Sequence, residues 1–124
     1  MKLDFDEDRR RLMIRGYGAG YLEVADRRIT SSCLVTPSAV HQDRLPERFS
    51  GLDASHVTAL LELEPDLVLF GTGPRQVFPP AAVLRPLIDG GIGYEIMDTR
   101  AACRSYNVLV SENRWVAAAL FIES

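Results

Sequence analysis

Two short polar segments of the 124-residue chain have the residue types of an anion-binding site. The first consists of Gly71, Thr72 and Gly73, directly after the apolar residues 67–70. Glycines at the end of a buried strand would let backbone N–H groups approach a bound carboxylate or phosphate closely. The dinucleotide fingerprint is incomplete, because Gln76 stands in place of a third glycine, and no Walker pattern with its lysine is present. The sequence therefore predicts a site for a small anion and excludes a nucleotide site.

The second polar segment is a predicted helix start. Asp98 and Thr99 are good capping residues, and the exposed amides at a helix start favour an anion. Arg100 and Arg104 lie in the first turns of that helix and add positive charge, and Arg75 could add more from the glycine loop. A plainer alternative stays open, in which the glycines only turn the chain and the capping residues only begin a helix. The predicted ligand-binding residues are Gly71, Thr72, Gly73, Asp98, Thr99 and Arg104.

Other kinds of site chemistry have little support in the sequence. His41 and His56 share no metal-ligand spacing with each other or with a cysteine. Cys103 falls among apolar residues of a predicted helix, which favours a buried side chain over a nucleophile. The serines have no visible base partner, and no Gly-x-Ser-x-Gly pattern occurs. We therefore predict no catalytic residues, no metal and no cofactor.

Charge and composition restrict the function further. The chain has 14 basic and 17 acidic residues, interspersed, and a net charge of -3, whereas a nucleic-acid-binding face needs a basic excess. The two cysteines lie outside any Cys-x-x-Cys pattern, which fits a reducing compartment. The first residues lack an apolar signal core, and no apolar run is long enough to span a bilayer. We expect no nucleic-acid partner, no membrane insertion and a cytoplasmic location.

The first third of the chain has the pattern of an antiparallel β meander. Residues 12–17 and 21–24 alternate apolar and polar side chains, and the glycines within and between them permit bulges or tight turns. Residues 28–36 are rich in β-branched side chains and predict one further strand. Residues 37–52 lack periodicity, and we interpret them either as a partner-facing loop or as a connection between two groups of strands.

The remainder of the chain alternates helices with strands. The predicted helices begin after Asp53, Pro80 and Asp98, and the predicted strands cover 67–70, 93–97 and 115–122. The second helix should be kinked or shortened by Pro86, and its predicted buried side holds Val83, Leu84, Leu87 and Ile88.

The order of these elements places the two polar segments together. A strand–helix–strand unit has parallel strands, so strands 67–70 and 93–97 end at the same edge of the sheet, where open α/β sheets form a crevice. The predicted fold is α/β. It is a three-layer single domain, residues 1–124, with a mixed, partly parallel central sheet flanked by helices and an N-terminal antiparallel β meander.

Four stretches of the sequence together resemble a known family. They are residues 67–73, 91–99, 101–109 and 114–120, and the strongest motifs are the glycine loop, Met97-Asp98-Thr99 and Arg104-Ser105-Tyr106-Asn107. The chain is similar to a family of small domains that includes the mitochondrial respiratory complex I assembly factor three and many bacterial and archaeal proteins of unknown function. Ser105 stands where threonine is expected, a mild departure.

This resemblance implies a three-layer α/β fold with a mixed sheet and extra β structure. It implies no established enzymatic activity, because the eukaryotic members act by binding other assembly proteins. The chain shows no mitochondrial targeting segment, which favours a bacterial relative. We therefore expect a non-catalytic protein-binding or assembly-factor-like module, and as an alternative a binder or enzyme for a small anionic metabolite at the crevice formed by 71–73 and 98–104. Unpaired strand edges also lead us to expect a homodimer.

Overall fold

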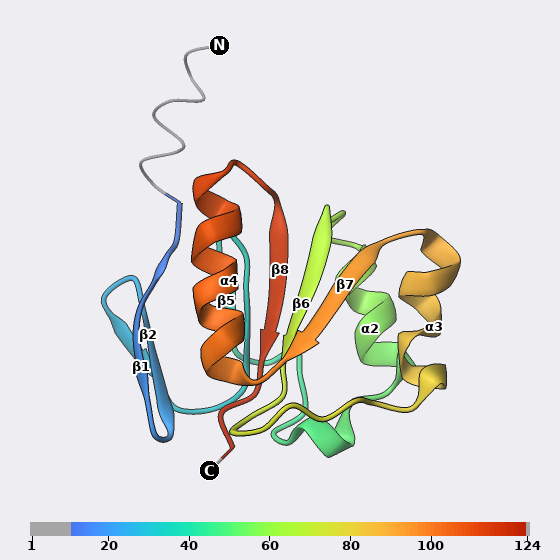
Figure 1. Ribbon diagram of the computed structural model, residues 1–124, viewed down its shortest axis with the longest axis horizontal. Helices are drawn as coiled ribbons and strands as arrows, with labels where there is room; N and C mark the ends of the chain where they lie inside the picture. The colour runs from blue at the N-terminus through green and yellow to red at the C-terminus, as the bar shows by residue number, and fades with distance from the viewer. Residues whose placement is uncertain (1–10, 124) are drawn as a thin grey trace.

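The computed structural model describes residues 11–123 of the chain, and these residues form two β-sheets and three α-helices (Figure 1). A small antiparallel sheet contains β1 (Ile14–Gly18), β2 (Tyr21–Val24) and β3 (Arg27–Ile29). A larger sheet has the strand order β5 (Val40–His41), β4 (Cys33–Val35), β8 (Val116–Leu120), β6 (Leu67–Gly71) and β7 (Gly93–Met97). The helices are α2 (Ala54–Leu61), α3 (Ala81–Gly90) and α4 (Thr99–Ser111), with a 3-10 turn η1 (Phe49–Gly51).

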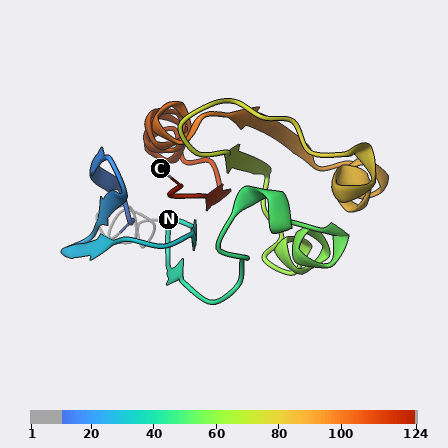
Figure 2. The same cartoon turned by 90° about the horizontal axis from the view of Figure 1, so that it is seen from below.

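The central strand of the large sheet is β6. It pairs in parallel with β7 on one side and with β8 on the other, whereas β4 joins β8 antiparallel, so the sheet is mixed. The chain passes from β6 through α3 to β7, and then back across β6 through α4 to β8. Consequently α4 covers one face of the sheet while α2 and α3 cover the other (Figure 2). The predicted α/β fold, its parallel strand–helix–strand unit and its N-terminal antiparallel sheet are confirmed.

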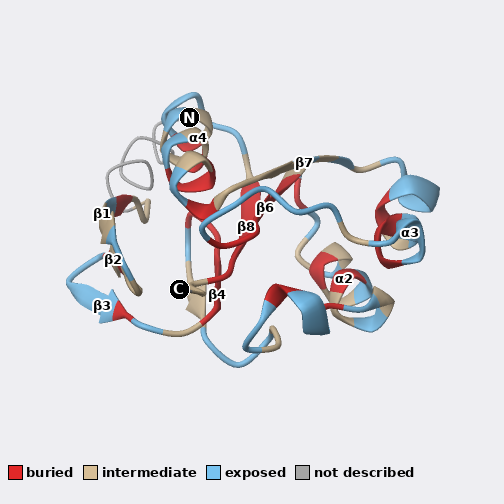
Figure 3. Cartoon of the chain, turned by 60° about the horizontal axis from the view of Figure 1, so that its bottom comes forward, coloured by how far each residue is buried: buried red, intermediate tan, exposed pale blue. Residues whose placement is uncertain are grey.

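Side chains alternate between the two faces of β6 and divide the core into two clusters. Leu69 packs in the cluster with α4 and the small sheet, whereas Val68 and Phe70 pack with α2 and α3. The three alanines of β8 are fully buried, so their small side chains let the neighbouring layers approach the sheet closely. Buried residues accordingly gather along β6 and β8 (Figure 3).

The small sheet is joined to α4 by the predicted Tyr106–Asn107 motif. The Asn107 side chain accepts a hydrogen bond from Ile14 N at 2.9 Å and donates one to Ile14 O at 2.8 Å, as a neighbouring strand would. The Tyr106 hydroxyl donates to Leu12 O at 2.9 Å. These bonds satisfy backbone groups at the edge of β1 and fix the small sheet beside the helix.

Three expectations for individual elements are corrected by the structure. Residues 28–36 are not one strand, because β3 belongs to the small sheet and β4 to the large one. Between them Ser32 turns inward, and its hydroxyl donates to Pro46 O at 2.7 Å. Residues 37–52 contain β5 and η1, so this segment extends the large sheet and contributes to the core. Ile88 is 50% exposed although it was expected on the buried side of α3. Helix α3 continues through Pro86 to Gly90, so Pro86 does not shorten it, and the kink stays a prediction.

Candidate functional site

Gly71, at the end of β6, lies against the first turn of α4. A Cβ atom added at this position would lie 3.0 Å from Leu120 Cδ2, 3.0 Å from Thr99 Cα and 3.1 Å from Ala102 Cβ. These distances are shorter than ordinary carbon contacts, and one of them is to backbone. The absence of a side chain at Gly71 is therefore required for helix α4 to pack on the sheet.

Thr99 joins the three chain segments that meet at the carboxyl edge of the large sheet. Its hydroxyl accepts a hydrogen bond from Gly73 N at 2.8 Å and donates one to Phe121 O at 2.8 Å, and its own N–H donates to Gly73 O at 2.9 Å. Thr99 and Gly73 are both buried. The hydroxyl thus satisfies two backbone groups that have no partner in the sheet ladder.

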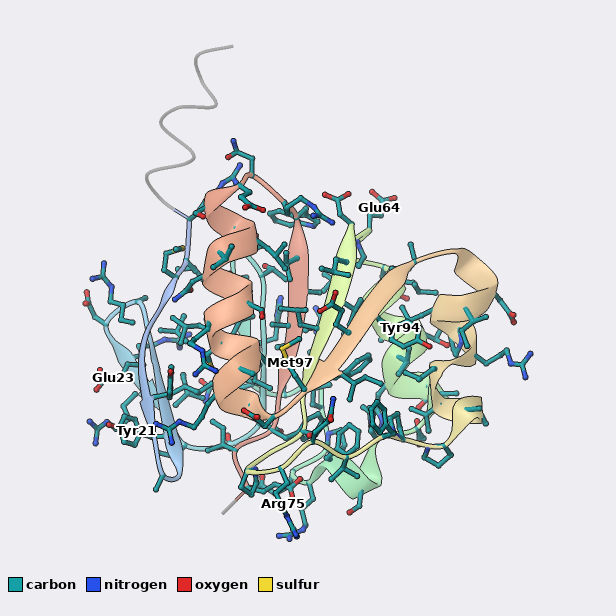
Figure 4. The ribbon with its side chains drawn as sticks, viewed as in Figure 1. Tyr21, Glu23, Glu64, Arg75, Tyr94 and Met97 are labelled. Atoms are coloured by element: carbon teal, nitrogen blue, oxygen red, sulfur yellow. The ribbon has the colours of Figure 1, made fainter. Side chains whose placement is uncertain are left out.

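Thr72 organises the loop that follows β6 in a similar way. Its N–H donates to Met97 O at 2.9 Å, which extends the pairing with β7 by one residue. Its hydroxyl donates to Arg75 O at 2.5 Å and accepts from Val77 N at 3.1 Å, so it closes a tight turn. Thr72 is only 3% exposed, whereas Arg75 is exposed and projects below the strand ends (Figure 4).

The remaining predicted residues, Asp98 and Arg104, have partners on α4 and on the small sheet. The Asp98 carboxylate accepts from Ala101 N at 2.9 Å and caps the helix. The exposed Arg104 guanidinium donates to the Tyr17 hydroxyl at 3.1 Å, and this bond is the main reason why the pKa of Arg104 is raised. The structure therefore brings Gly71, Thr72, Gly73, Asp98 and Thr99 together and directs Arg104 toward β1. Anion binding by these six residues stays a prediction.

Beside this cluster lies a cleft of about 400 Å³, which we call the hairpin cleft. One wall is the β1–β2 hairpin, residues 17–22, and the other walls are residues 73–74, 99–100 and 121–123. It shares Gly73, Thr99 and Arg100 with the predicted crevice, but sequence reasoning missed the hairpin wall. From the alternating glycines of this hairpin we predicted only bulges or tight turns, and no ligand site. Both are present, as a register shift between Ile14 and Gly16 and a positive φ of 81° at Gly20.

Reactive and metal-binding groups are scarce in the described part of the chain. Cys33 and Cys103 are free and buried, and burial raises the pKa of each thiol from its ordinary value of 9.0 to about 12. Both thiols are therefore protonated at neutral pH and poor nucleophiles. Within residues 11–123, no three metal-ligating side chains gather, and none of the helices is long and apolar enough to cross a bilayer.

Comparison with known proteins identifies the family. Residues 14–121 match the family model described as "Protein of unknown function (DUF498/DUF598)". The chain belongs to this family. A crystal structure of a family-like protein from Bordetella parapertussis is 35% identical in sequence, superposes with a TM-score of 0.84, and the match covers 91% of this chain and 97% of that one.

Two curated relatives connect the family to named proteins. NADH dehydrogenase (ubiquinone) 1 alpha subcomplex assembly factor 3 of Danio rerio is 31% identical over 109 residues, which are 87% of this chain and 63% of that protein. The "13 kDa major membrane protein" of Francisella tularensis is 32% identical over 77 residues, 62% of each chain. The chain thus spans about six-tenths of the length of these relatives. The resemblance to the complex I assembly factor is confirmed.

A second surface feature of this family member lies a few residues beyond the glycine loop. Val77 and Phe78 are 48% and 68% exposed, and they are followed by Pro79 and Pro80. We call these four residues the 77–80 segment. The sequence analysis used only its prolines, as the start of the helix that follows, and assigned no role to Val77 and Phe78.

Proposed function

We propose that the chain is a non-catalytic protein-binding module of the assembly-factor kind, and that the 77–80 segment is its contact with a partner protein. The observation that carries this proposal is the 68% exposure of Phe78 next to the half-exposed Val77. Large exposed apolar side chains that lie together mark interaction sites more often than chance exposure does.

The 77–80 segment is held in place although it is exposed. Val77 N donates to the Thr72 hydroxyl at 3.1 Å, and the Gln76 side chain donates to Ile96 O at 2.8 Å. The two prolines restrict the backbone further, and Pro80 has φ -58° and ψ 149°, the polyproline II conformation. A segment ordered before binding loses little conformational entropy when a partner covers it.

The expected energy is sufficient for a specific contact. Complete burial of one large apolar side chain contributes about 1.5–3 kcal/mol, and aromatic anchors dominate many protein interfaces. Extended proline-containing segments commonly dock in apolar grooves lined by aromatic residues. We therefore propose a partner protein with such a groove. The family relationship to an assembly factor supports a protein partner in general, while a homodimer and a cytoplasmic location stay predictions.

Site-specific photo-crosslinking in the native cell tests this proposal. A photoreactive amino acid replaces Val77 in one version of the chain and Val108 in the other. Val108 is a matched control, because it is a 56% exposed valine on α4, which covers the opposite face of the sheet from α3 (Figure 2). We expect one defined protein to be crosslinked from position 77 and not from position 108.

The crosslinked protein is then purified and its affinity for the wild-type chain is measured by calorimetry. Phe78→Arg should weaken the complex by about 30-fold or more, because loss of an aromatic anchor costs about 2 kcal/mol or more. Val108→Arg should leave the affinity unchanged. Equal affinity of the wild type and Phe78→Arg, or no crosslinked protein specific to position 77, would refute the proposal.

A further inference from the structure

We propose that the hairpin cleft binds a small monoanionic carboxylate with a flat apolar body, of the class of aromatic acids. The proposal is independent of the protein-binding role, since the cleft contains no residue of the 77–80 segment. It refines the alternative of a small anionic ligand, because it names a cleft, a cation and a ligand class.

The size and walls of the cleft suit such a ligand. Its volume of about 400 Å³ lies in the range of small-molecule sites, about 300–1,000 Å³. Leu22 and Phe121 are buried residues of its lining, and Ile122 and Pro74 add further apolar surface. Leu22 and Phe121 are 1% and 0% exposed and lie behind the surface of the cleft, so the hydrocarbon that a ligand can touch is that of Ile122 and Pro74. The apolar body of the ligand is therefore expected to lie against them.

The hairpin wall is preformed. The Tyr21 ring lies across Gly18 so closely that a Cβ at Gly18 would be 2.5 Å from it, and the Arg28 guanidinium lies 4.1 Å from the ring centre. Tyr17 is held from the side of α4, because its hydroxyl accepts from Arg104 and the Arg100 guanidinium lies 5.3 Å from its ring centre. Both aromatic side chains are thus fixed to the protein, so the cleft does not have to form when a ligand arrives.

The charge of the cleft selects an anion. Arg100 is exposed and lines the cleft, and it has no hydrogen-bonded or ion-paired partner among residues 11–123. Glu123, the carboxylate in the lining, accepts a hydrogen bond from Phe49 N and faces Arg48 at 3.8 Å. Arg100 is therefore the charge without a counter-ion, and a planar guanidinium binds a carboxylate through two parallel hydrogen bonds.

The same groups disfavour a phosphate dianion. The positive end of the α4 helix dipole is not available to a ligand, because the Asp98 carboxylate already caps the helix start. Arg100 is the basic side chain in the lining of the cleft, so it can balance one negative charge of a ligand and leaves a second one unpaired. A ligand with one charge near Arg100 and an apolar remainder matches both the cation and the walls.

An NMR titration of the full-length, ¹⁵N-labelled protein tests this inference with four probes. Phenylacetate carries both features of the ligand, acetate carries only the charge, benzyl alcohol carries only the apolar ring, and inorganic phosphate carries the competing charge. We expect saturable amide shifts at Gly18, Gly20, Gly73 and Ile122 with phenylacetate. Each of the other three probes should bind at least about tenfold more weakly, because it lacks the charge or the ring, or carries the second negative charge.

Two matched arginine variants complete the test. Arg100→Gln should weaken phenylacetate binding about tenfold, whereas Arg85→Gln, an exposed arginine on α3, should bind like the wild type. Both side chains are on the surface, so the amide spectrum of each variant should retain the folded pattern. The inference is overturned by non-saturable shifts with phenylacetate, by shifts that map outside the cleft, or by equal binding to the wild type and Arg100→Gln.

Discussion

The stretch of chain from the last residue of β6 to the start of α3 has two halves of opposite character. Its first half, residues 71–73, is buried. Gly71 packs closely against α4 and accepts a hydrogen bond from the segment after β8, Thr72 donates to β7, and Gly73 forms hydrogen bonds with α4. Its second half, the 77–80 segment, exposes an aromatic side chain to solvent. The Thr72 hydroxyl joins the two halves by accepting a hydrogen bond from Val77 N, and between them the Gln76 side chain donates to Ile96 O on β7.

Residues that hold the fold together and residues that we propose bind a partner thus lie within one short stretch of chain. A glycine–threonine–glycine loop at the carboxyl edge of a parallel sheet suggests a ligand, yet the backbone N–H groups of Thr72 and Gly73 already donate within the chain. Those groups stabilise what we call the junction, where the end of β6, the start of α4 and the segment after β8 meet. The 77–80 segment contributes little to that junction, and it is the segment that we propose contacts a partner. Substitutions taken in order from the buried junction, Thr99 of α4 included, to the exposed 77–80 segment should therefore have steadily smaller effects on stability.

The largest effect is expected for Gly71→Val, which places a branched side chain against α4 and Leu120. Because the nearest atoms are 3.0–3.1 Å from the added Cβ, the free energy of unfolding should fall by about 3 kcal/mol, measured by urea denaturation. Gly93→Ala on β7 is the control, since its Cβ would meet only Leu67 Cδ1 at 3.5 Å. Comparable losses in both variants would contradict the packing role of Gly71.

A somewhat smaller effect is expected for Thr99→Val, which keeps the shape of the side chain and removes its hydroxyl. Gly73 N and Phe121 O would each lose a partner, and leaving buried polar groups unpaired should lower the free energy of unfolding by about 2 kcal/mol. Thr99→Ser retains the hydroxyl and should recover more than half of that loss. If the serine variant is as unstable as the valine variant, the hydroxyl is not what holds the junction.

The buried junction was largely predictable from the sequence, because its signals are local. A short apolar run predicts β6, Asp98 predicts a helix cap, and the alternation of strands and helices places their ends at one edge. The contact of Tyr17 with Arg100 and Arg104 was not predictable. It joins residues more than eighty positions apart, and nothing in either segment specifies the other.

Local signals also misplace residues whose burial depends on the tertiary structure. Residues 28–36 have strand composition throughout, but composition does not say that the chain changes sheets between β3 and β4. Ile88 has the spacing of a buried helix face, yet it is 50% exposed, and the buried residues of α3 are Val83, Leu84 and Leu87. Phe78 is a further example, because an aromatic residue before two prolines gives no local indication that its side chain is 68% exposed.

A still smaller effect is expected for Gln76→Ala, at the boundary of the two halves. The variant loses one exposed hydrogen bond to Ile96 O, so the free energy of unfolding should fall by about 0.5–1 kcal/mol. Amide exchange at Val77 should become faster, because the segment is then held only through Thr72. Gln42→Ala provides the control, as Gln42 is exposed and makes no hydrogen bond in residues 11–123. Unchanged exchange at Val77 would show that Gln76 does not hold the segment.

The smallest effect on stability is expected for Phe78→Ser. Because Phe78 is 68% exposed, its loss should change the free energy of unfolding by less than about 0.5 kcal/mol. Phe49→Ser gives the contrast, since Phe49 is 6% exposed and packs edge-to-face on Phe121 with ring centres 5.4 Å apart, and its removal should cost about 3 kcal/mol or more. Denaturation of both variants measures this difference. A stable Phe78→Ser protein that loses its partner would separate binding from folding, whereas a loss of stability close to that of Phe49→Ser would place Phe78 in the architecture of the fold.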